Sequence, residues 1–388
     1  MTRTVRIAYL IDTISSDKAG TEKQLLNILK RLPMDALVIC LHDSPWLAAN
    51  RLPCDVVTLG YRGFLTPGFP FVLASYLRLL KERNIDIVQT FFEDSMFAGF
   101  LGKVLSRKQH ALVVSRRDLG LGSDEPAYHG LFRKIRPHVF RLCDGIAVNA
   151  HAIKDHVAAH EQVPPGKITV IGNGLDLPVP PPVLPSLFRE SKADVWIAIA
   201  ANLKPIKRID LLVRALAHLK DTGVKDVVRA VVLGEGRLES ELTHLATDLG
   251  IGDRVHFVGA VENVSDYLYG ADIGVLCSDK EGLSNAILEY MACGLPVVAT
   301  DAGGNGELVN EMNGACVPTG DHVALAHALA RLIESPCLRK ELGAHSLEKV
   351  RQNFTWDKVL PQWENYYDSL AKGLARGNNP VENTHAEA

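Results

Sequence analysis

The sequence predicts an α/β protein made of two domains of similar size, each with a parallel sheet covered by helices. Three observations carry this prediction. Short apolar runs alternate with helical patterns over residues 5–171 and again over residues 195–318, which is typical of a parallel sheet with helices on both faces. A proline-rich stretch separates the two series. The 388 residues, 47% of them hydrophobic, are enough for two separate cores.

The first domain is expected over residues 1–176. Its opening apolar run, Val5–Ile11, shows little alternation and predicts a buried parallel strand. A polar loop follows, and then a helix over Glu22–Leu32. Six further strands are expected at Leu37–Leu41, Val56–Leu59, Ile85–Gln89, Leu112–Ser115, Gly145–Asn149 and Ile168–Ile171. Asn173, Gly174 and Asp176 are expected to form a structural turn at the end of the domain.

A stiff connector is expected over residues 177–190, because five prolines within residues 177–188 exclude a helix or a central strand. The second domain follows over residues 191–353, with strands at Val195–Ala200, Val227–Leu233, Val255–Val258, Ile273–Cys277, Pro296–Thr300 and Ala315–Pro318. A terminal helix is expected over residues 354–372, with Thr355 as its N-cap candidate and a kink at Pro361. The polar residues 373–388 are expected to be disordered.

The charge and cysteine content exclude some classes of function. The net charge of −3 does not indicate a nucleic-acid partner, although residues 1–175 carry 22 basic and 16 acidic side chains. The seven cysteines form no C-x-x-C pair, which suits free thiols in a reducing compartment. No signal peptide is recognised, and the longest uncharged run, 15 residues between Arg62 and Arg78, is too short to span a bilayer. The expected location is the cytoplasm, with attachment to the inner face of the membrane left open.

Residues 280–309, KEGLSNAILEYMACGLPVVATDAGGNGELV, are the most informative stretch. Glu281 and Glu289 lie eight residues apart, with a glycine-bearing turn between them, and a helical run, a buried-strand pattern and Gly303-Gly304 follow. Backbone N–H groups at the N-terminus of a helix can hold a phosphate, and carboxylates on either side of the turn can accept hydrogen bonds from hydroxyls. The pattern therefore predicts a site for a sugar nucleotide.

This stretch resembles the E-x7-E signature of the retaining family 4 glycosyltransferases, also called glycosyl transferases group 1. The resemblance implies the GT-B fold, in which two Rossmann-like βα domains face each other across a cleft and a C-terminal helix crosses back to the first. It also implies that Glu289 accepts from the ribose hydroxyls and Glu281 from the donor sugar. The backbone expected to meet the sugar and phosphate is that of Gly282, Leu283, Ser284 and Asn285.

The segment AANLKPIKRID resembles the family's phosphate-gripping R-L-x-P-x-K-G. Lys207 matches the lysine of that segment, and the resemblance makes Lys207 and Glu281 the expected catalytic residues. Asn202 stands where the family has arginine, and Arg208 stands where it has glycine. Lys204 is a candidate to replace the missing arginine; the alternative for Lys204 is a solvated, basic start of a helix.

Three further positions are expected to bind the sugar donor by resemblance. Gly234 stands in a strand-then-G-x-G segment on the nucleotide side, which lacks the third glycine of a dinucleotide fingerprint. Val264 ends a loop whose backbone is expected to meet the base, so the base cannot be identified from side chains. Gly20 matches the glycine turn that faces the diphosphate across the cleft.

The acceptor side is expected at Arg116, Arg117 and Asp118, where many relatives read V-x-H-D and Arg117 replaces the histidine. Either arginine can hold a phosphate or an anionic acceptor, or can pair with a nearby acid. Residues 128–142 mix cations with large apolar side chains at helical spacing. That segment suits the surface of an anionic membrane or, equally, a solvated helix packed on its own core.

The expected function is that of a cytoplasmic, retaining hexosyltransferase. It would transfer a hexose from a UDP- or GDP-sugar to a hydroxyl of a glycan or lipid-linked acceptor, as in polysaccharide or glycolipid synthesis. No metal is expected, because no D-x-D stands at a strand end and lysines and helix N-termini can stabilise the leaving diphosphate. No cofactor is expected, since the nucleotide sugar is a substrate. The alternatives are a non-catalytic subunit that binds a nucleotide sugar, made plausible by the missing arginine and histidine, and a GT-B sugar-nucleotide epimerase.

Overall fold

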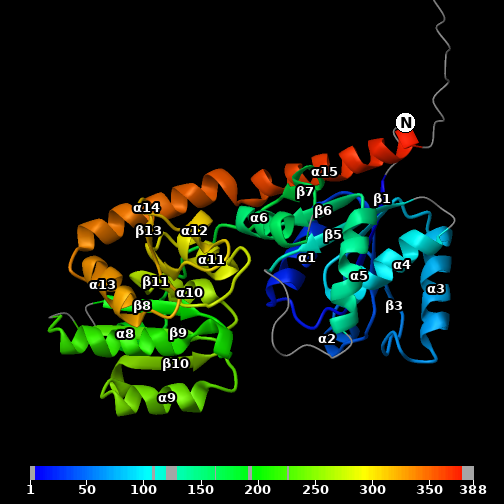
Figure 1. Cartoon of the computed structure of the whole chain (residues 1–388). Helices are drawn as coiled ribbons and strands as arrows, with labels where there is room; N and C mark the ends of the chain where they lie inside the picture. The colour runs from blue at the N-terminus through cyan, green and yellow to red at the C-terminus, as the bar shows by residue number, and fades with distance from the viewer. Residues whose placement is uncertain are drawn as a thin grey trace, which may run out of the picture. The chain divides into compact units, whose positions relative to one another are not determined.

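A computed structural model of the chain describes residues 5–106, 110–118, 129–161, 163–190, 195–224 and 227–377. The chain divides into two compact units (Figure 1). Unit 1 comprises Met1–Asn149, Lys154–Ile171 and Leu360–Ala388, and unit 2 comprises Ala150–Ile153 and Gly172–Val359. The described part of each unit is built around one parallel sheet, so the predicted α/β class is confirmed.

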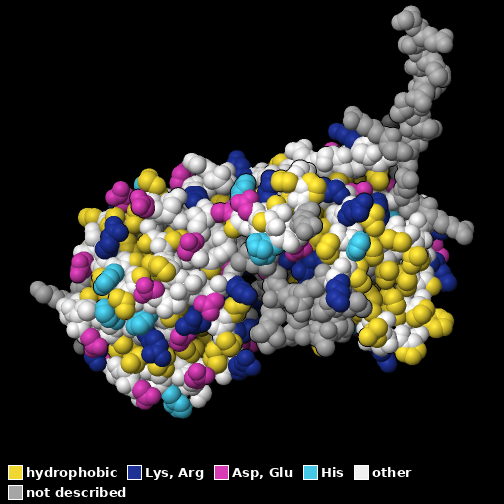
Figure 2. Space-filling view, in the orientation of Figure 1, with side chains coloured by type: hydrophobic (Ala, Val, Ile, Leu, Met, Phe, Trp, Pro, Cys, Tyr) yellow, Lys and Arg dark blue, Asp and Glu magenta, His cyan; other side chains and the backbone are white. Residues whose placement is uncertain are grey.

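Unit 1 has a parallel sheet in the order β3-β2-β1-β4-β5-β6-β7. Its strands are β1 (Arg6–Ile11), β2 (Asp35–Cys40), β3 (Asp55–Thr58), β4 (Ile87–Thr90), β5 (Ala111–Arg116), β6 (Gly145–Val148) and β7 (Ile168–Val170). The helices are α1 (Gly20–Arg31), α2 (Pro45–Ala49), α3 (Phe69–Glu82), α4 (Glu93–Leu105), α5 (His129–Leu142), α6 (His151–His160) and the 3-10 turn η1 (Pro165–Lys167). The first three residues of α6 belong to unit 2. Apolar side chains gather over α3 and α4 on one face of this unit (Figure 2).

Unit 2 has a parallel sheet in the order β10-β9-β8-β11-β12-β13. Its strands are β8 (Val195–Ala200), β9 (Val228–Leu233), β10 (Val255–Gly259), β11 (Ile273–Leu276), β12 (Val297–Thr300) and β13 (Gly314–Val317). The helices are α7 (Ser186–Glu190), α8 (Ile209–Asp221), α9 (Glu239–Asp248), α10 (Val264–Leu268), α11 (Asn285–Ala292), α12 (Asn305–Leu308), α13 (His322–Ile333) and α14 (Pro336–Asn353), with 3-10 turns η2 (Pro205–Lys207) and η3 (Gly252–Arg254). Every strand expected from the sequence is present, with ends shifted by at most about two residues.

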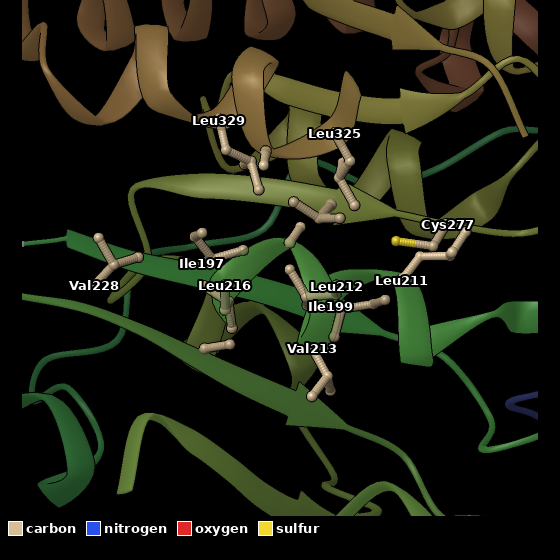
Figure 3. Close-up of a cluster of buried hydrophobic side chains, with 14 of the residues drawn as sticks. Ile197, Ile199, Leu211, Leu212, Val213, Leu216, Val228, Cys277, Leu325 and Leu329 are labelled. Atoms are coloured by element: carbon tan, nitrogen blue, oxygen red, sulfur yellow. The ribbon is translucent and has the colours of Figure 1, made fainter. Parts of the chain in front are cut away.

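The core of unit 2 forms where α8 meets the sheet (Figure 3). Eight of the thirteen residues of α8 are buried, among them Leu212 and Leu216, which pack with Ile197 and Ile199 of β8. Each such side chain contributes about 1.5–3 kcal/mol on burial. The helix that follows the β8 loop is therefore firmly fixed, and it holds the end of that loop in place.

The terminal helix α15 (Trp356–Gly377) begins in unit 2 and continues into unit 1 at Leu360. Tyr367 is buried in unit 1, where its hydroxyl donates to Gln89 Oε1 at 2.5 Å and accepts from the Tyr9 hydroxyl at 3.3 Å. The helix runs five residues beyond the expected end at residue 372, because Leu374, Ala375 and Arg376 are strong helix formers. Residues 378–388 of the expected tail lie outside the described residues.

In each unit, the strand order reverses at one point. The chain leaves β1 toward β2 on one side while β4 lies on the other, and it leaves β8 toward β9 while β11 lies on the other side. Loops from the carboxyl ends of two such strands diverge, and open α/β sheets bind their ligands there. The loops after β1 and β4, and those after β8 and β11, are therefore where a ligand is expected. No helix in the described ranges is long and apolar enough to cross a bilayer.

Candidate active site

The two residues expected to be catalytic lie side by side at the reversal point of unit 2. Lys207 ends η2 in the loop after β8, and Glu281 lies in the loop after β11. Lys207 Nζ donates to Glu281 Oε1 at 2.5 Å, and the two side chains are 27% and 12% exposed. The loops are also joined through their backbones, since Asp279 N–H donates to Ile206 C=O at 2.9 Å. A cation and a carboxylate thus share one partly exposed position at the carboxyl edge of the sheet.

Arg208 makes the turn that directs the chain from Lys207 into α8. Its φ of 45° and ψ of 44° are left-handed, a conformation that is uncommon for any residue except glycine. Arg208 Nε donates to Asp210 Oδ1 at 3.0 Å, and Nη1 donates to Asp279 Oδ1 at 3.3 Å. The hydrogen bonds that the guanidinium donates to Asp210, together with the charges of Asp210 and Asp279, raise its pKa. The left-handed turn explains why the family segment has glycine here.

The turn expected to meet the sugar and phosphate forms the N-terminus of α11. Ser284 is its N-cap, and the Ser284 hydroxyl accepts from Ile287 N–H at 3.3 Å. Asn285 and Glu289 are four residues apart, so they lie on one face of the helix, and both are half-buried. The buried Asn173 holds the turn from below, because its Nδ2 donates to Leu283 C=O at 3.0 Å and to Asn285 Oδ1 at 2.8 Å.

Glycines let four loops approach one another closely, in two pairs. Gly304 N–H donates to Gly282 C=O at 2.9 Å, and Gly303 has a φ of 57°, where a Cβ would lie 1.9 Å from the Glu281 carbonyl oxygen. At Gly234, a Cβ would lie 2.2 Å from the Ala201 carbonyl oxygen. The loops after β12 and β9 therefore close on the loops that carry Glu281 and Lys207, and no other residue type fits these points.

The remaining residues expected to bind the donor occupy separate places. Asn202 and Lys204 are exposed in the same loop as Lys207, where Lys204 N–H donates to Asn202 C=O at 2.8 Å. Val264 is half-buried at the start of α10, after β10, which lies two strands from β8. Gly20 belongs to unit 1, where it is exposed as the first residue of α1.

Two supports of this site escape sequence reasoning. Tyr290 is fully buried and accepts from Ala200 N–H at 2.6 Å, which fixes the end of β8; burial raises its pKa, so its hydroxyl stays neutral. Thr300 Oγ1 donates to Ser278 C=O at 2.6 Å and joins the ends of β12 and β11. The only sequence signal is a hydroxyl-bearing side chain within an otherwise apolar run.

In unit 1, Arg116 forms ion pairs with acidic side chains. Of the two roles considered for it, an anion-binding residue or a partner of a nearby acid, this is the second. Arg116 Nη1 lies 3.3 Å from Glu93 Oε1, and its Nη2 lies 3.4 Å from Glu161 Oε1. Arg136 of α5 joins the same buried cluster, 2.7 Å from Glu93 Oε1 and 3.6 Å from Glu161 Oε1. The Arg136 charge is therefore taken up by these acids. It does not face a membrane surface, as the membrane interpretation of residues 128–142 requires. The side chain of Arg133 lies outside the described residues.

Arg117 and Asp118 continue from β5 in different surroundings. The Arg117 guanidinium lies 5.9 Å from the centroid of the Phe91 ring, and burial lowers its pKa to about 10. The Asp118 side chain is 73% exposed. At the reversal point itself, Asp12 Oδ1 accepts from Ser95 N–H at 2.9 Å. Burial, reinforced by the charge of Asp94, raises the pKa of Asp12 to about 6.

Within the described ranges, no group of three or more His, Cys, Asp or Glu side chains is placed to hold a metal ion.

Comparisons with known proteins show the family and the fold of this chain. The model for "Glycosyltransferase Family 4" matches residues 19–178, and that for "Glycosyl transferases group 1" matches residues 194–335. The chain is 26% identical over 328 residues to the N-acetyl-alpha-D-glucosaminyl L-malate synthase of Bacillus anthracis, covering 81% of this chain and 84% of that protein. It is 32% identical over 307 residues to the D-inositol 3-phosphate glycosyltransferase of Mycobacteroides abscessus, covering 75% of this chain and 66% of that protein.

Among solved structures, Alr3699/HepE of Anabaena in complex with UDP and glucose superimposes with a TM-score of 0.79 at 22% identity, covering 94% of this chain and 100% of that one. Two parallel-sheet units of this kind match the GT-B fold of that structure. With both family models matched in sequence order, the chain belongs to glycosyltransferase family 4. The predicted fold and family are thereby confirmed.

Proposed function

We propose that this protein is a retaining, metal-independent hexosyltransferase that uses a UDP- or GDP-sugar and glycosylates a hydroxyl of a glycan or lipid-linked acceptor. The observation that carries the proposal is the pairing of Lys207 with Glu281 at 2.5 Å, beside the N-terminus of α11. A diphosphate needs a cation and backbone N–H groups, and a sugar needs a carboxylate that accepts from its hydroxyls. The complex of HepE with UDP and glucose supports this class of donor.

The chemistry follows from these groups. The acceptor hydroxyl oxygen attacks the anomeric carbon on the face of the leaving group while the bond from that carbon to the phosphate oxygen breaks. The departing diphosphate takes the acceptor proton, so the step needs no side chain as base. Lys207 and the α11 N-terminus stabilise the negative charge that grows on the diphosphate, and this stabilisation lowers the barrier. Glu281 orients the sugar, and Glu289 accepts from the ribose hydroxyls.

Glu281 also has a role before the donor binds. It neutralises Lys207 and fixes the Nζ position, so the lysine is already placed when the diphosphate arrives. In the loaded enzyme, the diphosphate takes over as the partner of Lys207, and Glu281 turns to the sugar hydroxyls. Preorganisation of this kind reduces the reorganisation needed in the reaction. The exposed Asn202, where the family has arginine, leaves Lys207 as the main phosphate cation and favours a non-catalytic nucleotide-sugar-binding subunit as the second candidate function.

The test is turnover of UDP- and GDP-hexoses by the full chain, with and without alcohol acceptors, and assignment of the product anomer by NMR. We predict an α-linked product from an α-linked donor. Lys207→Ala should lower kcat by about 100- to 1,000-fold, which is typical for loss of one preorganised group at a developing charge. Lys340→Ala, an exposed lysine of α14, is the matched control and should keep full activity.

Two results would reject the proposal in different ways. A β-linked product would contradict the retaining mechanism while leaving the transferase assignment in place. Tight binding of UDP or GDP with no turnover of any donor, even as hydrolysis, would assign the chain to the binding-subunit class. A thermal shift screen finds the right nucleotide first, because a ligand at 100 times its Kd adds about 2.7 kcal/mol to stability.

A further inference from the structure

One face of unit 1 carries large apolar side chains that nothing in the described chain covers. Only Tyr76 and Leu80 are buried among the fourteen residues of α3, whereas α8 buries eight of thirteen. Phe71 in the first turn of α3 is 77% exposed, and Leu65 in the preceding loop is 83% exposed. Pro67, Pro70 and Ala74 are exposed beside them. We call these five residues, Leu65, Pro67, Pro70, Phe71 and Ala74, the α3 face.

The apolar surface extends beyond the α3 face. Helix α4, which contacts α3, exposes Val104 and Leu105 in its last turn, at 53% and 50%. Figure 2 shows the resulting broad apolar area over these two helices. Single exposed apolar residues are ordinary on soluble proteins, but a contiguous patch of this kind marks an interaction site.

The loop that presents Leu65 is held in place by packing. Phe64 contacts Tyr61, Phe69 and Phe97, with ring centroids 5.0, 4.9 and 5.8 Å apart. The turn is also closed by the Thr66 hydroxyl, which donates to Gly63 C=O at 2.8 Å. Because its neighbour Phe64 is anchored in this aromatic cluster, Leu65 points outward from an ordered loop. The exposure is therefore a built feature of unit 1.

The charges around the α3 face are mainly positive, with one exposed acid, Glu82, at the end of the helix. Residues 56–81 contain Arg62, Arg78 and Lys81 and no Asp or Glu, and all three cations are exposed. Phe71, Ala74 and Arg78 are spaced at three and four residues, so they share one side of α3. Long cationic side chains can lay their methylenes on apolar surface and keep their charges at its edge. This combination suits a partner that is apolar inside and anionic at its surface.

We propose that the α3 face docks unit 1 on an anionic lipid bilayer. Leu65 and Phe71 enter the boundary between headgroups and acyl chains, and Arg62, Arg78 and Lys81 meet lipid phosphates. A second copy of this chain fits less well, because a two-fold axis would bring like-charged arginines together. The inference rests on the proposed function in one respect: a lipid-linked acceptor would be the reason for unit 1 to bind a membrane. It also moves the membrane contact from α5, where Arg136 is held in ion pairs, to α3.

The experiment is flotation of the full chain with phosphatidylcholine vesicles that contain or lack phosphatidylglycerol. We expect binding to the anionic vesicles at low salt, at least about tenfold weaker binding to the zwitterionic ones, and release by high salt. Leu65→Ser with Phe71→Ser should weaken binding by at least about tenfold, since burial of one such side chain alone accounts for that factor. Arg62, Arg78 and Lys81 changed to Ser should remove the preference for anionic lipid.

The matched control is Val179→Ser with Val183→Ser, two comparably exposed valines in the connector, at 81% and 62%. The control should bind within about twofold of wild type. Equal binding by the Leu65/Phe71 variant, or no binding to anionic vesicles, would overturn the proposal. Self-association that depends on Leu65 and Phe71, without vesicle binding, would also overturn it and assign the face to a second copy. Donor hydrolysis measured on the same samples separates failure of this inference from failure of the proposed function.

Discussion

Arg208 is the residue in which the geometry of the candidate site conflicts most with ordinary backbone preference. A left-handed conformation costs a non-glycine residue about 1–2 kcal/mol, and here it lies directly between Lys207 and α8. Exposed ion pairs contribute at most about 1 kcal/mol, so the bonds to Asp210 and Asp279 offset only part of this cost. The turn lies directly after Lys207, whose ammonium donates to Glu281.

This conformation makes the order of two substitutions predictable. Arg208→Ala should destabilise the chain by about 1–2 kcal/mol, because it loses both ion pairs and keeps the left-handed backbone. Arg208→Gly should lie within about 0.5 kcal/mol of wild type, since relief of the backbone strain offsets the lost pairs and the extra entropy of the unfolded glycine. Urea unfolding of the two variants measures the difference. An alanine variant as stable as the glycine variant would show that residue 208 is not left-handed in solution.

At this scale, the sequence identifies residues that belong to a local pattern and misses those defined by distant contacts. Lys207 and Glu281 stand in two short motifs, and the structure places them together. Asn173 donates to residues more than a hundred positions away, and no local pattern could reveal its hold on the α11 turn. For Arg116, the sequence could not decide between an acceptor anion and an acid, because the choice depends on how Glu93 and Glu161 fold toward it.

Among the elements, helix α4 is notable because its N-terminus is capped by a residue that is distant in sequence and follows strand β1. Asp12, just after β1, accepts from Ser95 N–H in the first turn of α4, where the N-cap Phe92 has no side chain able to do so. Burial is the largest cause of the raised pKa of Asp12, and the charges of Asp94 and Glu93 add to it. The carboxylate therefore anchors the N-terminus of the helix, and the free-energy cost of keeping it ionised in a buried position depends on pH.

The sign of this dependence follows from the two pKa values. The pKa rises from an ordinary 3.8 to about 6 on folding, so the native state holds the proton more tightly than the unfolded chain does. The contribution of Asp12 to stability is then greatest below pH 3.8 and falls as the pH rises toward 6. Asp12→Asn keeps an acceptor but cannot ionise, so its stability relative to wild type should rise by about 1–3 kcal/mol from pH 4.5 to pH 7.5. Urea unfolding at both pH values checks this, and a pH-independent difference would be evidence against it.

The helices and strands could be predicted from the sequence, but which of their faces are buried and which are exposed could not. Every expected strand is present, because a buried parallel strand is a continuous apolar run and the runs are separated by clear helical patterns. Helices α3 and α5 show what an amphipathic sequence pattern cannot predict. Both mix apolar and basic residues, and only the fold shows that Arg136 of α5 is 11% exposed and held in ion pairs while Phe71 of α3 is 77% exposed. An amphipathic pattern shows that a helix has two faces and leaves open which of them is covered.

In the whole molecule, the same arrangement occurs in two units, each with a parallel sheet whose strand order reverses once. In unit 2, the loops at that reversal bring Lys207, Glu281 and the α11 N-terminus together. In unit 1, the corresponding loops carry Asp12 and the residues after β4. The division of work proposed here is that unit 2 holds the nucleotide sugar, while unit 1 offers the acceptor and, through the α3 face, contacts the membrane.

The most direct test of this account is to locate the nucleotide by hydrogen–deuterium exchange of the full chain with saturating UDP or GDP. The account predicts slower exchange in peptides that cover residues 201–208 and 277–289, where backbone N–H groups and the two glutamates meet the ligand. Glu289→Gln should weaken nucleotide binding and reduce this protection at equal nucleotide concentration, because the ribose hydroxyls lose a charge-assisted partner. Protection confined to unit 1, or protection in unit 2 that spares both segments, would contradict a nucleotide site at the junction of β8 and β11.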